Sequence, residues 1–148
     1  MMRRLPGWRK RLETAIDAIE RTPFAWDGAD CFAGWAAKAV EAVLGIDIAA
    51  DYRGRYTSEQ EALAIIRRHQ CPDLVAFITE LLTHELGTEC NIAPGEARVG
   101  DLVAIPDGSA FGCTLGIVNG ERVLVRRPDG KGSVDRRLAI AAWRIGDA

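Results

Sequence analysis

The amino-acid sequence predicts an α+β fold in which a helical first part packs on an antiparallel sheet formed by the second part. Apolar residues recur at helical spacing up to about residue 88, and short apolar runs separated by tight-turn residues follow it. Helices first and strands second favour two separate layers over alternating βα units. We therefore expect a single domain, 1–148, with a helical part, 1–88, and a sheet part, 98–146, of about five strands.

Four apolar stripes predict the helices, at residues 8–19, about 31–44, 58–69 and 72–86. Asp30 is the expected N-cap of the second helix, which places Cys31 at its first helical position. The S-x-x-E spacing from Ser58 to Glu61 matches a capping box. Pro72 suits the first turn of the fourth helix, and Gly87 suits its C-terminal stop.

Five apolar segments predict the strands: "DLVAI", "GCTLGIV", "ERVLV", "GSVDRRL" and "AAWRI". Asn119-Gly120 lies between the second and third of them. This dipeptide is a strong hairpin signal, because a type I′ turn needs a positive φ at both of its central residues. The segments are therefore expected to pair as antiparallel neighbours.

The composition is that of an ordinary globular protein, with 48% hydrophobic and 27% charged residues and a net charge of -2. Such a balance predicts no nucleic-acid partner and no membrane partner. We interpret the basic cluster near the N-terminus as a solvated helix face (Arg3, Arg4, Arg9, Lys10 and Arg11). The start of the chain has no signal-peptide h-region, so a soluble protein with four free thiols is expected.

No metal site or cofactor is expected. His69, Cys71, His84 and Cys90 are of the residue types that zinc prefers, but their spacing matches no familiar finger. A helix of about 14 residues between Cys71 and His84 would hold these two residues roughly 20 Å apart. We interpret both histidines as surface residues near helix C-termini.

Cys31 is the candidate catalytic residue. A thiol at a helix start lies near the positive end of the helix dipole, which favours the nucleophilic thiolate. Free cysteines are also common as small buried residues, and burial disfavours the thiolate. Both interpretations remain open from position alone, although we expect burial to have the larger effect on the pKa of Cys31.

The segment "TPFAWDGADCFAG" is similar to the Y-x-W-G-G-x-D-C-S-G motif of NlpC-type peptidases, papain-like cysteine hydrolases that cut peptidoglycan and recur on phage tails. Gly100-Asp101-Leu102-Val103 and Leu115-Gly116-Ile117-Val118 resemble their later G-D-L-V and H-V-G-I strands. More closely, the whole chain resembles a small uncharacterised family of phage and prophage tail-gene clusters. The residues of that resemblance are Pro23–Trp26, Asp30-Cys31, Arg53–Tyr56, Leu115–Ile117 and Ala141–Arg144.

The chain departs from the hydrolase pattern around Cys31. The family's histidine falls on Thr114, or on Cys113 if the strand slips by one residue, and neither side chain acts as a base near neutral pH. The third catalytic residue would fall near 124–126, where no His, Asn or Gln stands. The tyrosine and the serine of the motif are replaced by Phe24 and Phe32.

The resemblance and its departures together predict a non-catalytic papain-like domain that serves as a phage tail or tail-assembly component. Its expected partners are other tail proteins, with peptidoglycan as a further candidate, and its expected place is the host cytoplasm before assembly and the virion afterwards. The alternative is an active cysteine hydrolase with Cys31 as nucleophile beside Asp30 and a base supplied by His84 or a partner chain. The candidate binding residues are Phe24, Trp26, Trp35 and Cys113.

Overall fold

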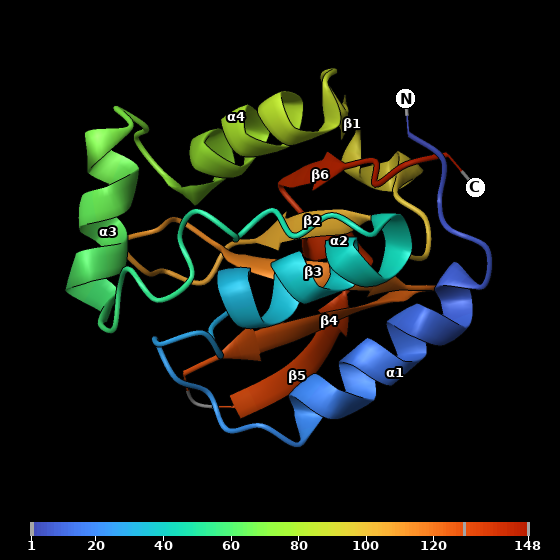
Figure 1. Cartoon of the computed structure of the whole chain (residues 1–148), viewed down its shortest axis with the longest axis horizontal. Coiled ribbons are helices and arrows are strands. Elements are labelled where there is room, and N and C mark those ends of the chain that lie inside the picture. Colours follow the sequence, from blue (N-terminus) through green and yellow to red (C-terminus); the bar gives the residue numbers. More distant parts are fainter. Residues whose placement is uncertain (1, 129, 148) are drawn as a thin grey trace.

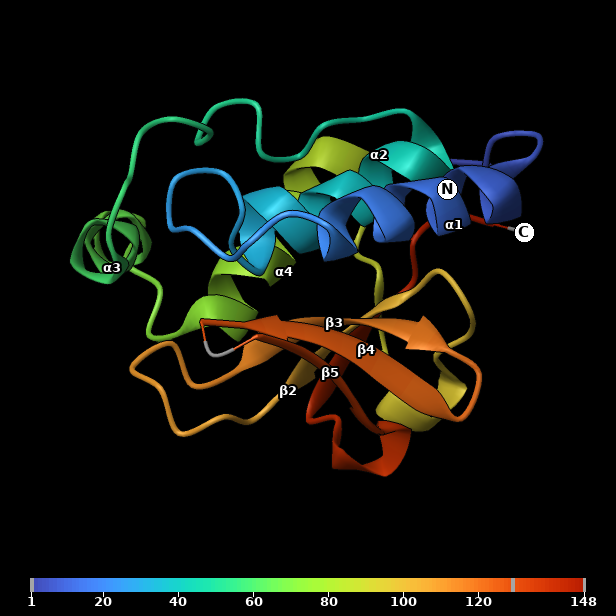
Figure 2. The ribbon, with the colours of Figure 1, turned by 90° about the horizontal axis from the view of Figure 1, so that it is seen from below.

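The computed structural model describes residues 2–128 and 130–147, with the helices in one layer and the sheet in the other (Figures 1 and 2). The helical layer consists of α1 (Trp8–Glu20), the π-helix η1 (Phe32–Ala36), α2 (Ala37–Leu44), α3 (Glu59–Arg68) and α4 (Leu74–Leu86). Figure 1 shows α3 at one end of the molecule, away from the other helices. The predicted α+β class, with the helical part first, is confirmed.

The sheet has the strand order β1-β6-β2-β3-β4-β5, and every neighbouring pair is antiparallel. Its strands are β1 (Asn91–Ile92), β2 (Leu102–Ile105), β3 (Thr114–Asn119), β4 (Arg122–Arg127), β5 (Gly130–Asp135) and β6 (Ala141–Trp143). The five predicted segments correspond to β2–β6. The sixth strand, β1, spans two residues and is too short to give an alternating pattern.

The β3–β4 hairpin forms, but its turn is one residue later than predicted. Asn119 pairs with Arg122, so Gly120 and Glu121 are the central residues. Among the described residues, positive φ occurs at Gly120 (φ 68) and not at Glu121. A positive φ at the first central residue alone is the type II′ pattern, whereas the sequence predicted type I′.

Each strand of the sheet centre buries both of its faces. Leu102 and Ala104 of β2 join the large core beneath the helices, whereas Val103 and Ile105 belong to a smaller cluster on the opposite face. This explains why the segment reads as a continuous apolar run rather than as an alternation. Two short 3-10 helices connect strands of the sheet: η2 (Pro94–Glu96) lies between β1 and β2, and η3 (Arg136–Leu138) lies between β5 and β6.

Local side-chain bonds set the starts of α3 and α4. The Ser58 hydroxyl accepts the Glu61 N–H at 3.1 Å, which confirms the predicted N-cap. The N-cap of α4 is Asp73, whose carboxylate accepts the Ala76 N–H at 2.9 Å. Pro72 therefore lies before the helix and not in its first turn, because Asp73 competes more effectively for the cap.

The second helix begins as a π-helix, which the sequence did not predict. Its first residue is Phe32, so Cys31 is the flanking residue and not the first helical one. The Ala36 N–H donates to the Cys31 carbonyl at 3.0 Å across five residues. Gly34 allows the preceding loop to pass close by, because a Cβ there would lie 2.5 Å from the Ala29 Cα.

The aspartate of the Gly100-Asp101 motif holds the two ends of the chain together. Asp101 is fully buried and forms ion pairs with Arg4 at 2.9 Å and with Arg144 at 3.0 Å. The Ile145 N–H donates to the same carboxylate at 2.9 Å. Arg4 is therefore buried and precedes α1, which corrects the prediction that the whole basic cluster is a solvated helix face.

Within residues 2–128 and 130–147, no helix combines the length and the apolar character needed to cross a bilayer.

Candidate functional site

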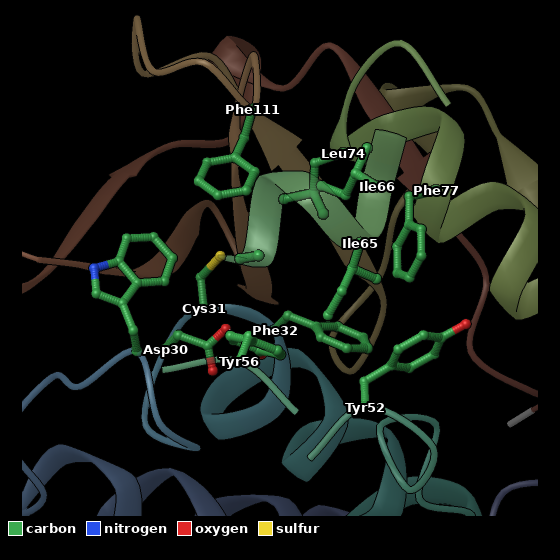
Figure 3. A pocket seen from close by; sticks show the side chains of 12 residues that line it. Asp30, Cys31, Phe32, Tyr52, Tyr56, Ile65, Ile66, Leu74, Phe77 and Phe111 are labelled. Atoms are coloured by element: carbon green, nitrogen blue, oxygen red, sulfur yellow. The ribbon is translucent and has the colours of Figure 1, made fainter. Parts of the chain in front are cut away.

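Cys31 lies at the start of η1, where the helix layer meets the sheet (Figure 3). The loop before it, residues 22–30, brings Trp26 and Asp30 to the same place. The Cys31 side chain is partly exposed, and its sulfur is free. The residue is thus partly exposed while its thiol is desolvated, and its reactivity depends on the groups beside the sulfur.

Asp30 is the buried acid beside Cys31, with 3% of its surface exposed. Its Oδ2 accepts the Tyr56 hydroxyl at 2.7 Å, and its Oδ1 accepts the Ala33 N–H at 3.2 Å. Burial raises the pKa of Asp30 above its usual value, and the bonds from Tyr56 and the backbone N–H groups only partly oppose this. Asp30 thus caps η1 through its side chain, as expected of an N-cap, although the helix begins one residue later than predicted.

Strand β3 supplies the groups nearest to the Cys31 sulfur. The Leu115 N–H and the Thr114 hydroxyl lie close enough to lower the pKa of Cys31. Desolvation and the charge of Asp30 act in the other direction and prevail, so the pKa of Cys31 is raised to about 11. This direction agrees with the expectation that burial has the larger effect on the pKa of Cys31.

Cys113 lies next to Thr114 in the chain, with 2% of its surface exposed. It belongs to the core beneath the helices, and burial raises the pKa of its thiol to about 12. Thr114 is also buried, and its hydroxyl donates to the Arg126 carbonyl at 3.0 Å. The structure therefore brings both alternative positions of the family histidine near Cys31, and neither carries a base.

Arg126 of β4 occupies the region where the hydrolase family has its third catalytic residue. Its guanidinium is buried and donates to the backbone carbonyls of Ile19, Thr22 and Ala29. Burial lowers the pKa of Arg126, while the charge of Asp30 raises it. The Arg126 side chain therefore connects the end of α1 and the loop before Cys31 to the sheet. It does not have the role of the family's third catalytic residue, which orients an imidazole.

A pocket opens beside the sulfur, and we call it the Cys31 pocket. Aromatic rings form most of its wall (Trp26, Phe32, Tyr52, Phe77 and Phe111), and aliphatic side chains of α3 and α4 complete it (Ile65, Ile66 and Leu74). Asp30, Cys31 and Tyr56 are its polar members. The volume of the pocket is about 40 Å³, which corresponds to about three water molecules.

The other candidate binding residues lie at different depths. Phe24 packs edge-on against Trp26, with 5.2 Å between the ring centroids. Trp26 also stacks on Phe111 at 5.7 Å, so these three rings form one group at the Cys31 pocket. Trp35 is 1% exposed, does not line the pocket, and donates its indole N–H to the Leu124 carbonyl.

Both histidines lie outside the Cys31 pocket. His69 and His84 are exposed and line a second surface depression with Asp51, Glu80 and Glu85. The ring of Phe77 separates the two pockets, since it lines both of them. His69 packs on that ring at 5.5 Å. The predicted surface positions near helix C-termini are confirmed, and neither histidine lines the Cys31 pocket.

Two important residues of the site were not predicted. Tyr56 and Arg126 reach Asp30 and Ala29 from distant parts of the sequence, and nothing in their own neighbourhoods marks them as buried. In the described part of the chain, no group of three or more His, Cys, Asp or Glu side chains is placed to hold a metal ion.

A family model described as "Domain of unknown function (DUF6950)" matches residues 3–145 of the chain. No curated protein and no solved structure matches it.

Proposed function

Because the chain belongs to the DUF6950 family, whose function the family description leaves open, we propose a function from the chain's own residues. We propose that it is a non-catalytic, NlpC-type papain-like domain that acts by binding, as a component of a phage tail or of its assembly. The observation that carries this proposal is the environment of the Cys31 sulfur. Thr114, Leu115 and the Cys113 thiol interact with it, and in the part of the chain that the structure describes no histidine lines its pocket.

This environment is unsuited to acyl transfer. With a pKa of about 11, roughly one Cys31 in ten thousand is a thiolate at pH 7. A hydrolase also needs an acid to protonate the leaving amine, and the Thr114 hydroxyl does not ionise in this pH range, so it cannot serve as that acid. The site therefore lacks both a base that takes the thiol proton and an acid that protonates the leaving amine. The pocket and the surrounding loops remain available for binding.

The resemblance to proteins of phage tail-gene clusters supports the tail assignment. Two residues of that resemblance, Arg53 and Tyr56, hold the start of η1: Arg53 donates to the Ala33 carbonyl at 2.8 Å and Tyr56 donates to Asp30 at 2.7 Å. The resemblance thus includes residues that shape the Cys31 pocket. A role in tail assembly would use this shaped surface rather than the thiol.

The test is recovery of the partner under native conditions. The chain, tagged at its own locus in a lysogen, is cross-linked during induction, and its partners are identified by mass spectrometry. We expect tail proteins, with the same set recovered by a Cys31→Ala variant. Recovery of the folded, expressed chain without any tail or virion protein would contradict the assembly role.

A second candidate function is an active cysteine hydrolase, and the Leu115 N–H favours it. An amide N–H beside a nucleophilic sulfur is the kind of donor that stabilises an oxyanion. The two candidates differ in turnover. We expect purified peptidoglycan to yield no new amino termini with the native chain, alone or with its recovered partners. Release that disappears in Cys31→Ala would establish the hydrolase instead.

A further inference from the structure

The walls of the Cys31 pocket are almost wholly apolar. Six of its residues are aromatic and four are alanine, isoleucine or leucine. Among residues whose side chains the structure describes, no lysine or arginine lines the pocket. Figure 3 shows the labelled rings and aliphatic groups around the pocket, with the Cys31 sulfur at one side of it. An entering group therefore exchanges water for hydrocarbon and sulfur contacts, which favours apolar groups.

The one charged member of the lining disfavours an anion. Asp30 contributes a buried carboxylate, and both of its oxygens already accept hydrogen bonds from the protein. An anionic group would meet this carboxylate without a compensating cation. The carboxylate-rich stem peptides of peptidoglycan are therefore poorly matched to the pocket.

The size of the pocket restricts the ligand further. A pocket volume of about 40 Å³ accepts the end of a side chain and not a whole peptide segment. Ala62, on α3, is the smallest side chain of the wall, so we expect a larger side chain at this position to reduce the space in the pocket.

We propose that the Cys31 pocket binds the uncharged aliphatic end of a side chain presented by the partner protein, such as the terminus of a leucine, isoleucine or methionine. This inference rests on the proposed function, in which the domain binds rather than cleaves. The Cys31 thiol then acts as part of the apolar wall, which is the behaviour of a buried free cysteine. Ala62 is the residue that determines the size of the accepted group.

Alkyl methanethiosulfonates test this proposal, because their alkyl groups must enter the pocket to react with Cys31. The thiolate attacks the sulfenyl sulfur, a disulfide forms, and methanesulfinate leaves with the electron pair of the broken bond. Methyl, ethyl and propyl reagents are compared with a sulfonate-bearing reagent, and labelling is assigned to Cys31 by peptide mass spectrometry. Each rate is divided by the rate for glutathione.

The expected result is a normalised rate that rises about two- to fourfold for each methylene, the range given by its burial. The sulfonate reagent should be about tenfold or more slower than the propyl reagent, because the charge is not compensated in the pocket. Equal normalised rates for the apolar and the anionic reagents would overturn the proposal.

Matched variants on α3 test whether the preference for longer alkyl groups arises in the Cys31 pocket. Ala62→Phe fills the pocket and should abolish the preference for longer alkyl groups, and Ala62→Leu should reduce it. Ala64→Phe makes the same change on the exposed side of the helix and should retain the preference. A preference that persists in Ala62→Phe, with the variant folded by circular dichroism, would contradict the assignment. If Ala62→Phe does not fold, Ala62→Leu replaces it, and an unchanged preference for longer alkyl groups in that variant would contradict the assignment.

This experiment is independent of whether the domain is an enzyme. The thiolate fraction of Cys31 is common to all reagents and cancels in the rate ratios, so an activated Cys31 would change every rate and leave the ratios unaltered. Failure of the proposed function would instead appear as peptidoglycan cleavage. Xenon, which binds dry apolar cavities, gives a reversible control: it should shift the methyl resonances of Ile65 and Leu74, and no shift would count against the pocket.

Discussion

Tyr56 donates its hydroxyl to Asp30 at 2.7 Å, and both residues are buried beside Cys31. The bond joins the loop before α3 to the start of η1, 26 residues apart in the sequence. It satisfies one oxygen of a buried carboxylate, which would otherwise be costly to desolvate.

Removing this hydroxyl should destabilise the fold. In Tyr56→Phe, Asp30 keeps its bond from Ala33 but loses the one from Tyr56, so we expect a loss of about 1–3 kcal/mol in the free energy of unfolding. Tyr52→Phe is the control, because the Tyr52 hydroxyl contacts His69 only at 3.4 Å on an exposed surface. Urea denaturation of both variants measures the difference, and equal losses would contradict the role of the buried bond.

The raised pKa of Asp30 predicts a pH dependence of stability. The folded chain holds the Asp30 proton more tightly than the unfolded chain, so stability from this group is full below its ordinary pKa of 3.8 and decreases as the pH rises through the raised value. Asp30→Asn removes this titration. We expect the difference in unfolding free energy between Asp30→Asn and the native chain to shift in favour of Asn as the pH rises from about 4. A difference independent of pH would show that Asp30 is not desolvated.

Arg126 should be essential for the loop before Cys31. Arg126→Met leaves three carbonyls without their donor, those of Ile19, Thr22 and Ala29. We expect a loss of about 2–5 kcal/mol and faster proteolysis within residues 22–29. Arg122→Met is the control, because the Arg122 guanidinium bonds to Ser133 on an exposed surface. Proteolysis at the native rate in Arg126→Met would contradict this role.

Gly34 should tolerate no side chain. Its added Cβ would lie 2.5 Å from the Ala29 Cα, which is backbone and does not move freely. We expect Gly34→Ala to destabilise the chain by about 1–3 kcal/mol, as overpacking does. At Gly95, where no atom lies within 4 Å of an added Cβ, alanine should be nearly neutral. Thermal unfolding of the two variants tests the close approach, and equal melting temperatures would refute it.

Much of the fold followed from local patterns in the sequence. The stripe from Trp8 to Ile19 and the cap at Ser58 depend on residues a few positions apart, so periodicity and capping rules were sufficient. The π-helix was not predictable in this way, since the close approach of Gly34 to Ala29 within it is a tertiary contact. Arg4, Tyr56 and Arg126 are buried by partners 26 or more residues away, and sequence spacing carries no record of such contacts.

The residues next to Cys31 were predicted from the sequence, whereas the residues that form the wall of the Cys31 pocket were predicted only in part. Cys31, Asp30 and Thr114 were identified from a motif, and the structure brings the three together. Trp35 was expected among the binding residues, but its side chain is buried in the core. The residues of α3 that close the Cys31 pocket had no distinguishing feature in the sequence apart from their apolar stripe.

The pH dependence of Cys31 alkylation tests the central claim, that this thiol is not an activated nucleophile, most directly. Iodoacetamide labelling of Cys31 is followed by peptide mass spectrometry across a pH series, with glutathione as the reference thiol. The raised pKa predicts a midpoint near 11, above the ordinary value of 9.0, and labelling at pH 7 slower than that of the reference. A midpoint below 9.0 with accelerated labelling at neutral pH would contradict the account and make Cys31 a catalytic nucleophile.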